Sequence, residues 1–183
     1  MTLDDKLQYL LDRFEIQDVL ALYARGQDDH QGSDGGILED WNRVFTDKAV
    51  VDYTEAGPPF GVCSHTELAE LMRGVAEAPG LMSGSFHNWQ HMQGLPTVEI
   101  RGDTAKARTD LFATHVGRTH AATPWHLFDA AIFHDDLVRT PHGWRIAYRR
   151  LQVIYVEIVE TVGLGKTPQS LMGEPPVAPQ GAG

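Results

Sequence analysis

The chain has 183 residues, of which 25 are acidic and 15 are Lys or Arg, so its formal net charge is −10 with histidine counted as neutral. This length fits one domain with its own core, and the ordinary composition disfavours disorder, collagen and coiled coils. The acidic balance argues against a protein that binds nucleic acid or an anionic membrane, because such a surface would be basic. The single cysteine, Cys63, excludes an intramolecular disulfide.

The first residues, MTLDDKLQYLLDRF, carry acids where a signal peptide needs a basic segment and an apolar run. No apolar stretch approaches the roughly 18–20 residues of a membrane span. We therefore expect a cytoplasmic protein with no membrane partner and no nucleic-acid partner.

Helices are predicted in the first third of the chain. Thr2 and Asp5 form a capping pattern, and the helix that follows is expected to end near Gly26. Its apolar residues recur at helical spacing and comprise Leu3, Leu7, Leu10, Leu11, Phe14, Val19, Leu22 and Tyr23. A polar loop over 27–36 and a short helix over 37–45 come next.

A strand over 49–54 places Val51 and Tyr53 on one face. Gly57, Pro58 and Pro59 then break the chain. The capping box of Ser64 and Glu67 begins a further helix, which the Pro79-Gly80 pair should end.

The second half of the chain reads as antiparallel strands, at 85–93, 97–101, 104–116, 125–139 and 144–159. Gly102-Asp103 and the segment 140–143 supply the hairpin turns. Along 104–116 the alternation places one set of residues on a common face, namely Ala105, Ala107, Leu111, Ala113 and His115. Helices followed by strands predict an α+β fold, with helices on one face of a curved sheet around an apolar pocket. We expect one domain over 1–160 and a Gly/Pro-rich C-terminal tail over 161–183.

Four runs, in this order, resemble the SnoaL-like branch of the nuclear-transport-factor-2-like (NTF2-like) superfamily: LYARGQDDHQ, WNRVFTDKAVVDYT, WQHMQGLPTVEIRGDTAKART and VRTPHGWRIAYRR. They span roughly residues 8–155. The resemblance implies a cone-shaped, cystatin-like α+β fold with a curved, mainly antiparallel sheet. Within the superfamily the pattern is most similar to the scytalone dehydratase and bile-acid dehydratase group.

That resemblance also implies a site. His91 matches the catalytic histidine of the group, and Asp28 stands where an aspartate orients that histidine. The further expected substrate contacts are His115, Tyr53, Tyr23, Trp89 and Arg149, with Arg150 as the alternative arginine. The chain departs from the group at 129–131, where Asp-Ala-Ala replaces a polar pair on a later strand.

The chemistry of such a site is elimination of water from a β-hydroxy carbonyl compound. Histidine, whose ordinary pKa is near 6.5, can act first as base and then as acid. A carboxylate on its other ring nitrogen fixes the tautomer, and a donor must stabilise the enolate oxygen.

Structural roles compete with this interpretation for each residue, and Asp29 competes with Asp28 for the orienting position. His87 and His91 would lie about 13 Å apart along a strand, too far for one metal ion. We therefore predict no metal and no cofactor.

The leading hypothesis is a cofactor-independent lyase that acts on a hydrophobic cyclic, polyketide- or steroid-like small molecule. An isomerase or polyketide cyclase could use the same base. A non-catalytic binding protein, or the small subunit of a ring-hydroxylating oxygenase, would lack the His91–Asp28 contact or the pocket. The apolar segment 153–159 indicates a buried sheet face or a subunit interface, and we expect a homo-oligomer, either a trimer or a dimer.

Overall fold

A long helix, α1 (Leu3–Asp29), begins the chain in the computed structural model, which describes residues 2–31, 36–75, 78–118 and 125–160. The predicted capping box is present, because the Asp5 N–H donates to Thr2 Oγ1 (3.1 Å) and the Thr2 N–H donates to Asp5 Oδ2 (2.6 Å). The helix continues past the predicted end at Gly26. Asp28 therefore lies in its last turn.

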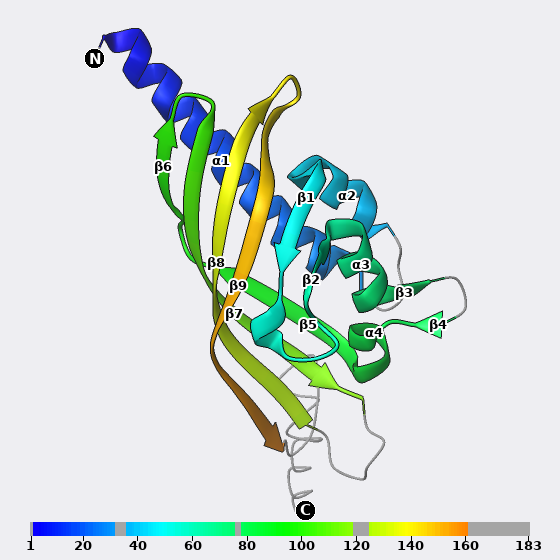
Figure 1. Cartoon of the computed structure of the whole chain (residues 1–183). Helices are drawn as coiled ribbons and strands as arrows, with labels where there is room; N and C mark the ends of the chain where they lie inside the picture. Colours follow the sequence, from blue (N-terminus) through cyan, green and yellow to red (C-terminus); the bar gives the residue numbers. More distant parts are fainter. Residues whose placement is uncertain (1, 32–35, 76–77, 119–124, 161–183) are drawn as a thin grey trace, which may run out of the picture.

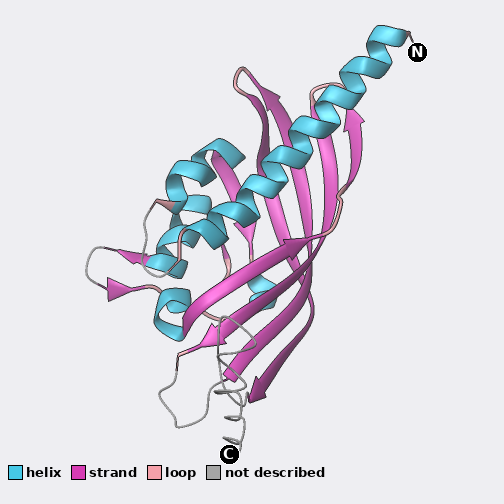
Figure 2. Ribbon diagram, turned by 180° about the vertical axis from the view of Figure 1, so that it is seen from behind, coloured by secondary structure: helices cyan, strands magenta, loops and turns pink. Residues whose placement is uncertain are grey.

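Only the second half of the predicted apolar stripe of α1 is buried. Of the predicted residues, Val19 and Tyr23 belong to the core and Leu22 packs against it. Ile16 and Leu20, which were not in the predicted stripe, are buried as well. The first half of the stripe is exposed, and it consists of Leu3, Leu7, Leu10, Leu11 and Phe14. In Figures 1 and 2 the N-terminal turns of α1 extend toward the end of the molecule where the β6 hairpin lies, while its later turns pass beside the other helices.

The remaining helices are short and lie on the same side of the sheet as α1 (Figure 2). They are α2 (Ile37–Val44), α3 (His65–Arg73) and α4 (Leu81–Ser85), with a 3-10 turn at Thr54–Ala56. The capping box of Ser64 and Glu67 begins α3 as predicted. Helix α4 was not predicted, because five residues are too few for a helical period to show.

The main sheet has the strand order β2-β1-β9-β8-β7-β5, and β6 pairs with part of β7. All pairs are antiparallel except β1 with β9, which is parallel. The strands are β1 (Phe45–Asp52), β2 (Val62–Ser64), β5 (Phe86–Gln93), β6 (Thr97–Arg101), β7 (Thr104–Gly117), β8 (Trp125–Thr140) and β9 (Gly143–Glu160). A separate hairpin consists of β3 (Gly74–Val75) and β4 (Ala78–Pro79).

The core lies between the helices and the inner face of this curved sheet. The predicted alternation of β7 is confirmed, since Ala105, Ala107, Leu111, Ala113 and His115 are all buried. The predicted α+β fold is therefore confirmed, with helices on one face of a curved, open mixed sheet (Figures 1 and 2). The predicted tail, 161–183, lies outside the described residues.

The far end of β9 is not the buried sheet face that was one of the two expectations for the segment 153–159. Ile154, Tyr155, Val156 and Ile158 are each at least half exposed, and Val159 is exposed to 36%. This apolar segment is therefore not a buried face of the sheet within one chain. None of the described helices is both long enough and apolar enough to cross a membrane.

Candidate active site

A cavity of about 360 Å³ lies between the C-terminal half of α1 and the inner face of the sheet. Volumes of this order are typical of small-molecule sites. Most of its wall is apolar and comprises Phe60, Met72, Leu81, Met82, Phe86, Leu111, Leu127, Ala131, Phe133, Leu151, Val153 and Val156. A small set of polar groups interrupts this wall, and it includes His91, His115 and Asp129. Such a cavity suits a hydrophobic molecule with one or two polar groups.

His91 of β5 and Asp28 of α1 form the central contact of the site. Nδ1 of His91 lies 2.7 Å from Asp28 Oδ1, and the His91 backbone N–H donates to both carboxylate oxygens at 3.1 and 3.0 Å. A carboxylate can only accept, so Nδ1 is the donor in this bond. The His91 side chain is only 10% exposed and lines the cavity. The arrangement presents an oriented base to a bound molecule.

Glutamines in the last turn of α1 and just beyond it bind the helix to β5. The backbone carbonyl of Gln27 accepts a hydrogen bond from Trp89 Nε1 at 2.7 Å. The Gln31 side chain bonds both backbone groups of Trp89, at 3.0 and 3.2 Å. Trp89 is two residues from His91 in the strand, so these bonds set the separation of His91 from Asp28. The sequence did not single out either glutamine. Gln27 bonds Trp89 through its backbone carbonyl, which any residue has, and only Gln31 uses its side chain.

His115 of β7 lies beside His91, with ring centroids 5.5 Å apart and an edge-to-face angle of 87°. It also packs against Phe86 and is 2% exposed. Burial lowers the pKa of His115 to about 3, and the nearby His91 and Arg73 act in the same direction. His115 is therefore a neutral imidazole at physiological pH.

Two phenols occupy another part of the cavity wall. The hydroxyls of Tyr23 and Tyr53 are hydrogen-bonded to each other, and Gln27 Nε2 donates to the Tyr23 hydroxyl at 3.3 Å. Burial raises the pKa of Tyr23 and raises that of Tyr53 well above its ordinary value. Both side chains are thus neutral, and because one hydroxyl donates to the other, only one O–H of the pair is left to donate to a substrate oxygen.

A match to the SnoaL-like domain model covers residues 8–150. The chain belongs to the SnoaL-like domain family. Uncharacterized proteins of Mycobacterium tuberculosis and Mycobacterium bovis are 33% identical to it over 138 residues, which is 75% of this chain and 82% of each relative.

Solved structures similar to this SnoaL-like protein support the NTF2-like, cystatin-like fold. A hexachlorocyclohexane dehydrochlorinase of Novosphingobium barchaimii has a TM-score of 0.65 at 18% identity, covering 89% of this chain and 99% of that one. A Novosphingobium aromaticivorans protein described as a candidate scytalone dehydratase gives 0.61 at 15%, covering 85% and 91%. A protein of the same species, described as NTF2-like with a cystatin-like fold, gives 0.59 at 21%, covering 83% and 88%.

Of the remaining predicted substrate contacts of this SnoaL-like protein, one lies at the cavity wall and one does not. Trp89 lines the cavity, and the Arg73 guanidinium lies 4.4 Å from the centre of its ring. Arg149 does not line the cavity. It is fully buried behind Tyr23 and Phe133, whose ring centres lie 4.0 and 4.1 Å from its guanidinium. The resemblance left open whether Arg149 or Arg150 faces the cavity, and the expected substrate contact of Arg149 is not present because the rings of Tyr23 and Phe133 separate it from the cavity.

Arg150 points to the other side of β9 and pairs with Glu55. Arg149 instead makes a two-pronged ion pair with Asp135 of β8, at 2.6 and 2.9 Å. Burial alone would lower the pKa of Arg149, but Asp135 outweighs this and raises it, so the guanidinium stays charged. Arg149 is thus a structural cation under the cavity wall.

No group of three or more potential metal ligands occurs among the described residues. His87 and His91 lie on β5 as predicted, with a register shift between Phe86 and Asn88. His87 is exposed, whereas His91 lines the cavity.

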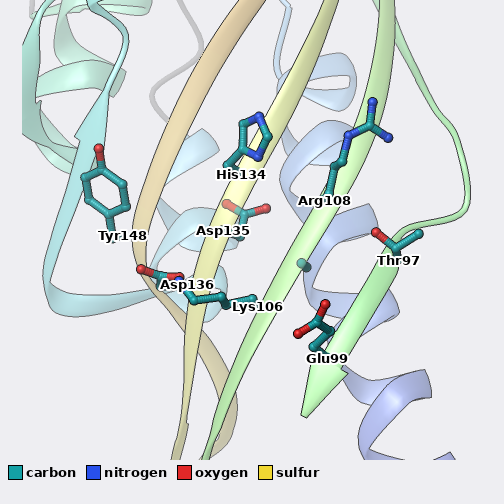
Figure 3. A pocket seen from close by; sticks show the side chains of 9 residues that line it. Thr97, Glu99, Lys106, Arg108, His134, Asp135, Asp136 and Tyr148 are labelled. Atoms are coloured by element: carbon teal, nitrogen blue, oxygen red, sulfur yellow. The ribbon is translucent and has the colours of Figure 1, made fainter. Parts of the chain in front are cut away.

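A second depression, of about 270 Å³, lies on the outer face of the sheet over β6, β7, β8 and β9 (Figure 3). Lys106 and Asp136 of its lining pair with each other at 2.6 Å, whereas Arg108 pairs with Asp110, which is not part of the lining. His134 lies within β8, and its Nε2 atom is 2.8 Å from Gln152 Oε1. Among the described residues His134 has no carboxylate partner, and the lining of the depression is mostly polar, so the inner cavity is the better candidate active site.

Proposed function

We propose that this protein is a cofactor-independent lyase of the dehydratase type, acting on a hydrophobic cyclic, polyketide- or steroid-like small molecule. The contact between His91 Nδ1 and Asp28 at the wall of an apolar cavity is the observation that carries the proposal. A carboxylate on Nδ1 fixes the tautomer of the histidine, which then serves as the base at an apolar wall.

In the proposed reaction, His91 Nε2 removes a proton from the carbon next to a carbonyl group. The electron pair of the C–H bond forms an enolate, with the negative charge on the former carbonyl oxygen. The enolate then re-forms the carbonyl group, and its carbon–carbon electron pair shifts to form the new double bond as the β-hydroxyl departs. The imidazolium returns its proton to that hydroxyl, so water leaves and His91 is restored. Asp28 stabilises the imidazolium, since its carboxylate is the acceptor of the Nδ1 proton.

Two of the structural neighbours have names that agree with elimination chemistry, while a third is described as a candidate aromatic ring hydroxylase. One is described as a candidate scytalone dehydratase and another as a dehydrochlorinase. A non-catalytic binding protein or oxygenase subunit has less support, because we expected such a protein to lack either the His91–Asp28 contact or the cavity.

A panel of cyclic β-hydroxy ketones in deuterated buffer tests this function. We expect the protein to form the conjugated enone, followed by its ultraviolet absorbance, faster than buffer does. Deuterium exchange at the α-carbon without loss of water would instead favour the isomerase or cyclase, which use the same base. If neither exchange nor dehydration exceeds the buffer rate for any member of the panel, the proposed function is wrong.

We also propose that the protein is a homo-oligomer, a trimer or a dimer. The exposed apolar stripe of α1 and the exposed end of β9 are two sets of apolar side chains that a monomer would leave in water. We expect sedimentation velocity to show an oligomer for the wild type and a smaller species for Leu7→Glu combined with Leu11→Glu. A wild type that sediments as a stable monomer at micromolar concentration would contradict the proposal.

A further inference from the structure

Asp129 of β8 is a carboxyl group of the cavity wall that the His91–Asp28 pair does not use. Its Oδ1 atom is buried and has no hydrogen-bond partner among the described residues. Its Oδ2 atom lies 3.9 Å from His115 Nδ1, which is beyond hydrogen-bond distance, and that Nδ1 also has no partner there. Buried polar atoms in native proteins are nearly always hydrogen-bonded. The open positions on Asp129 and His115 therefore mark a place where a ligand atom is expected.

The strand register places Asp129 opposite His91 across one small residue. Ala113 of β7 pairs with His91 on one side and with Asp129 on the other. Directly paired residues point to the same face of a sheet, and the two outer backbones are roughly 10 Å apart. Ala113 contributes only a methyl group to the floor between them. A small molecule lying over Ala113 would contact His91 at one end and Asp129 at the other.

The surroundings of Asp129 favour its neutral form. Burial raises the pKa of this carboxyl, and His91 opposes the effect only in part. The ionisable groups that face it are His91 from β5, itself paired with Asp28, and the neutral His115 from β7. Its partner on β9 is Val156, which carries no charge. A protonated carboxyl donates a hydrogen bond, whereas an ionised one can only accept.

We propose that Asp129 is a second catalytic residue of the cavity, which donates a hydrogen bond to the carbonyl oxygen of the substrate. This inference rests on the proposed function and narrows the substrate to a carbonyl compound whose acidic C–H faces His91 while its oxygen faces Asp129. When His91 takes the proton, the C–H electron pair forms the enolate double bond and negative charge moves to the oxygen. The Asp129 O–H stabilises that charge and keeps its own proton throughout.

A bound ketone can report on this contact through its own carbonyl stretch. The probe is 1-tetralone labelled with ¹³C at the carbonyl carbon, and tetralin, the hydrocarbon of the same ring skeleton, is the matched ligand. Infrared difference spectra compare the wild type with Asp129→Leu and Asp129→Asn. Asp136→Asn is the matched protein control, because Asp136 lies on the same strand but pairs with Lys106 on the outer face.

We expect the wild type and Asp136→Asn to lower the frequency of the carbonyl stretch. Asp129→Leu should remove that shift and weaken tetralone binding by roughly 5-fold, with tetralin binding unchanged. Asp129→Asn keeps a donor and should give an intermediate shift. Rising pH should abolish the shift in the wild type but not in Asp129→Asn, because only the carboxyl group loses its proton.

Equal spectra for the wild type and Asp129→Leu would overturn the inference, as would a wild type that binds tetralone no better than Asp129→Leu does. Failure of this inference and failure of the lyase function are distinguishable. If the wild type turns over the hydroxy ketones but shows no carbonyl shift, or the same shift as Asp129→Leu, only the role of Asp129 is removed. A clear shift in a protein that neither dehydrates nor exchanges the hydroxy ketones removes only the lyase function.

Discussion

Replacing His91 with alanine is expected to lower the turnover of a β-hydroxy ketone by roughly 10²–10⁴-fold, the usual contribution of a general acid–base group. The proton carrier is lost, whereas the strand pairing of β5 with β7 and the backbone N–H bonds to Asp28 involve main-chain atoms that alanine keeps. Initial rates of enone formation measure the effect, and thermal unfolding followed by circular dichroism checks that the fold persists. Wild-type turnover in His91→Ala would exclude His91 as the base.

The Asp28→Asn variant separates two effects of Asp28, its action on the His91 ring and its support of strand β5 through the His91 backbone N–H. The amide oxygen can still accept the His91 backbone N–H, but the charge that stabilises the imidazolium is gone, so turnover should fall strongly while stability changes little. Asp29→Asn is the matched control, because the Asp29 side chain is 61% exposed and pairs only loosely with Arg25, at 3.6 Å. Equal rates for the two asparagine variants would contradict the assignment of Asp28.

Arg149→Leu is expected to destabilise the protein by about 3–5 kcal/mol, the usual cost of removing one partner of a buried ion pair. Both Arg149 and Asp135 have 0% exposed side chains, so the variant leaves the Asp135 carboxylate without compensation. The substitution also removes the contacts that the guanidinium makes with the Tyr23 and Phe133 rings. Urea unfolding at constant pH measures the change in the free energy of unfolding.

Arg150→Leu provides the neighbouring comparison, because Arg150 and Glu55 are 37% and 44% exposed. An exposed pair contributes about 1 kcal/mol or less, so this variant should stay close to the wild type. The double variant Arg149→Leu with Asp135→Leu should regain part of the loss, since no buried charge remains. Similar unfolding free energies for Arg149→Leu and Arg150→Leu would show that the buried pair has no special role.

Local signals predicted the helices and strands well, because each signal depends on only a few adjacent residues. The capping boxes at Thr2 and Ser64 mark the starts of two helices, and Gly102 has the positive φ of a tight turn between β6 and β7. Periodicity shows which residues share a face but not what covers that face. Leu7 and Tyr23 therefore looked alike in the sequence, whereas one is exposed and the other is buried.

The contact between His91 and Asp28 in the candidate site was predictable because the family resemblance supplied long-range information. His91 and Asp28 are 63 residues apart, and no local pattern joins them. The position of Asp129 across Ala113 depends on the register of three strands, which the sequence does not specify by itself. The environment of Arg149 depends on two aromatic rings from α1 and β8, and these meet only when the helix packs on the sheet.

The position of β9 between β1 and β8 also decides the order in which this protein can be built. Val50 of β1 pairs with Tyr148 of β9, so β1 cannot pair with β9 until almost a hundred further residues have been synthesised. Contacts that distant in sequence form late and slowly. A growing chain on the ribosome can already form α1 and the hairpin of β6 and β7. It cannot join β1 to the rest of the sheet, and so cannot close the cavity, until β9 has emerged.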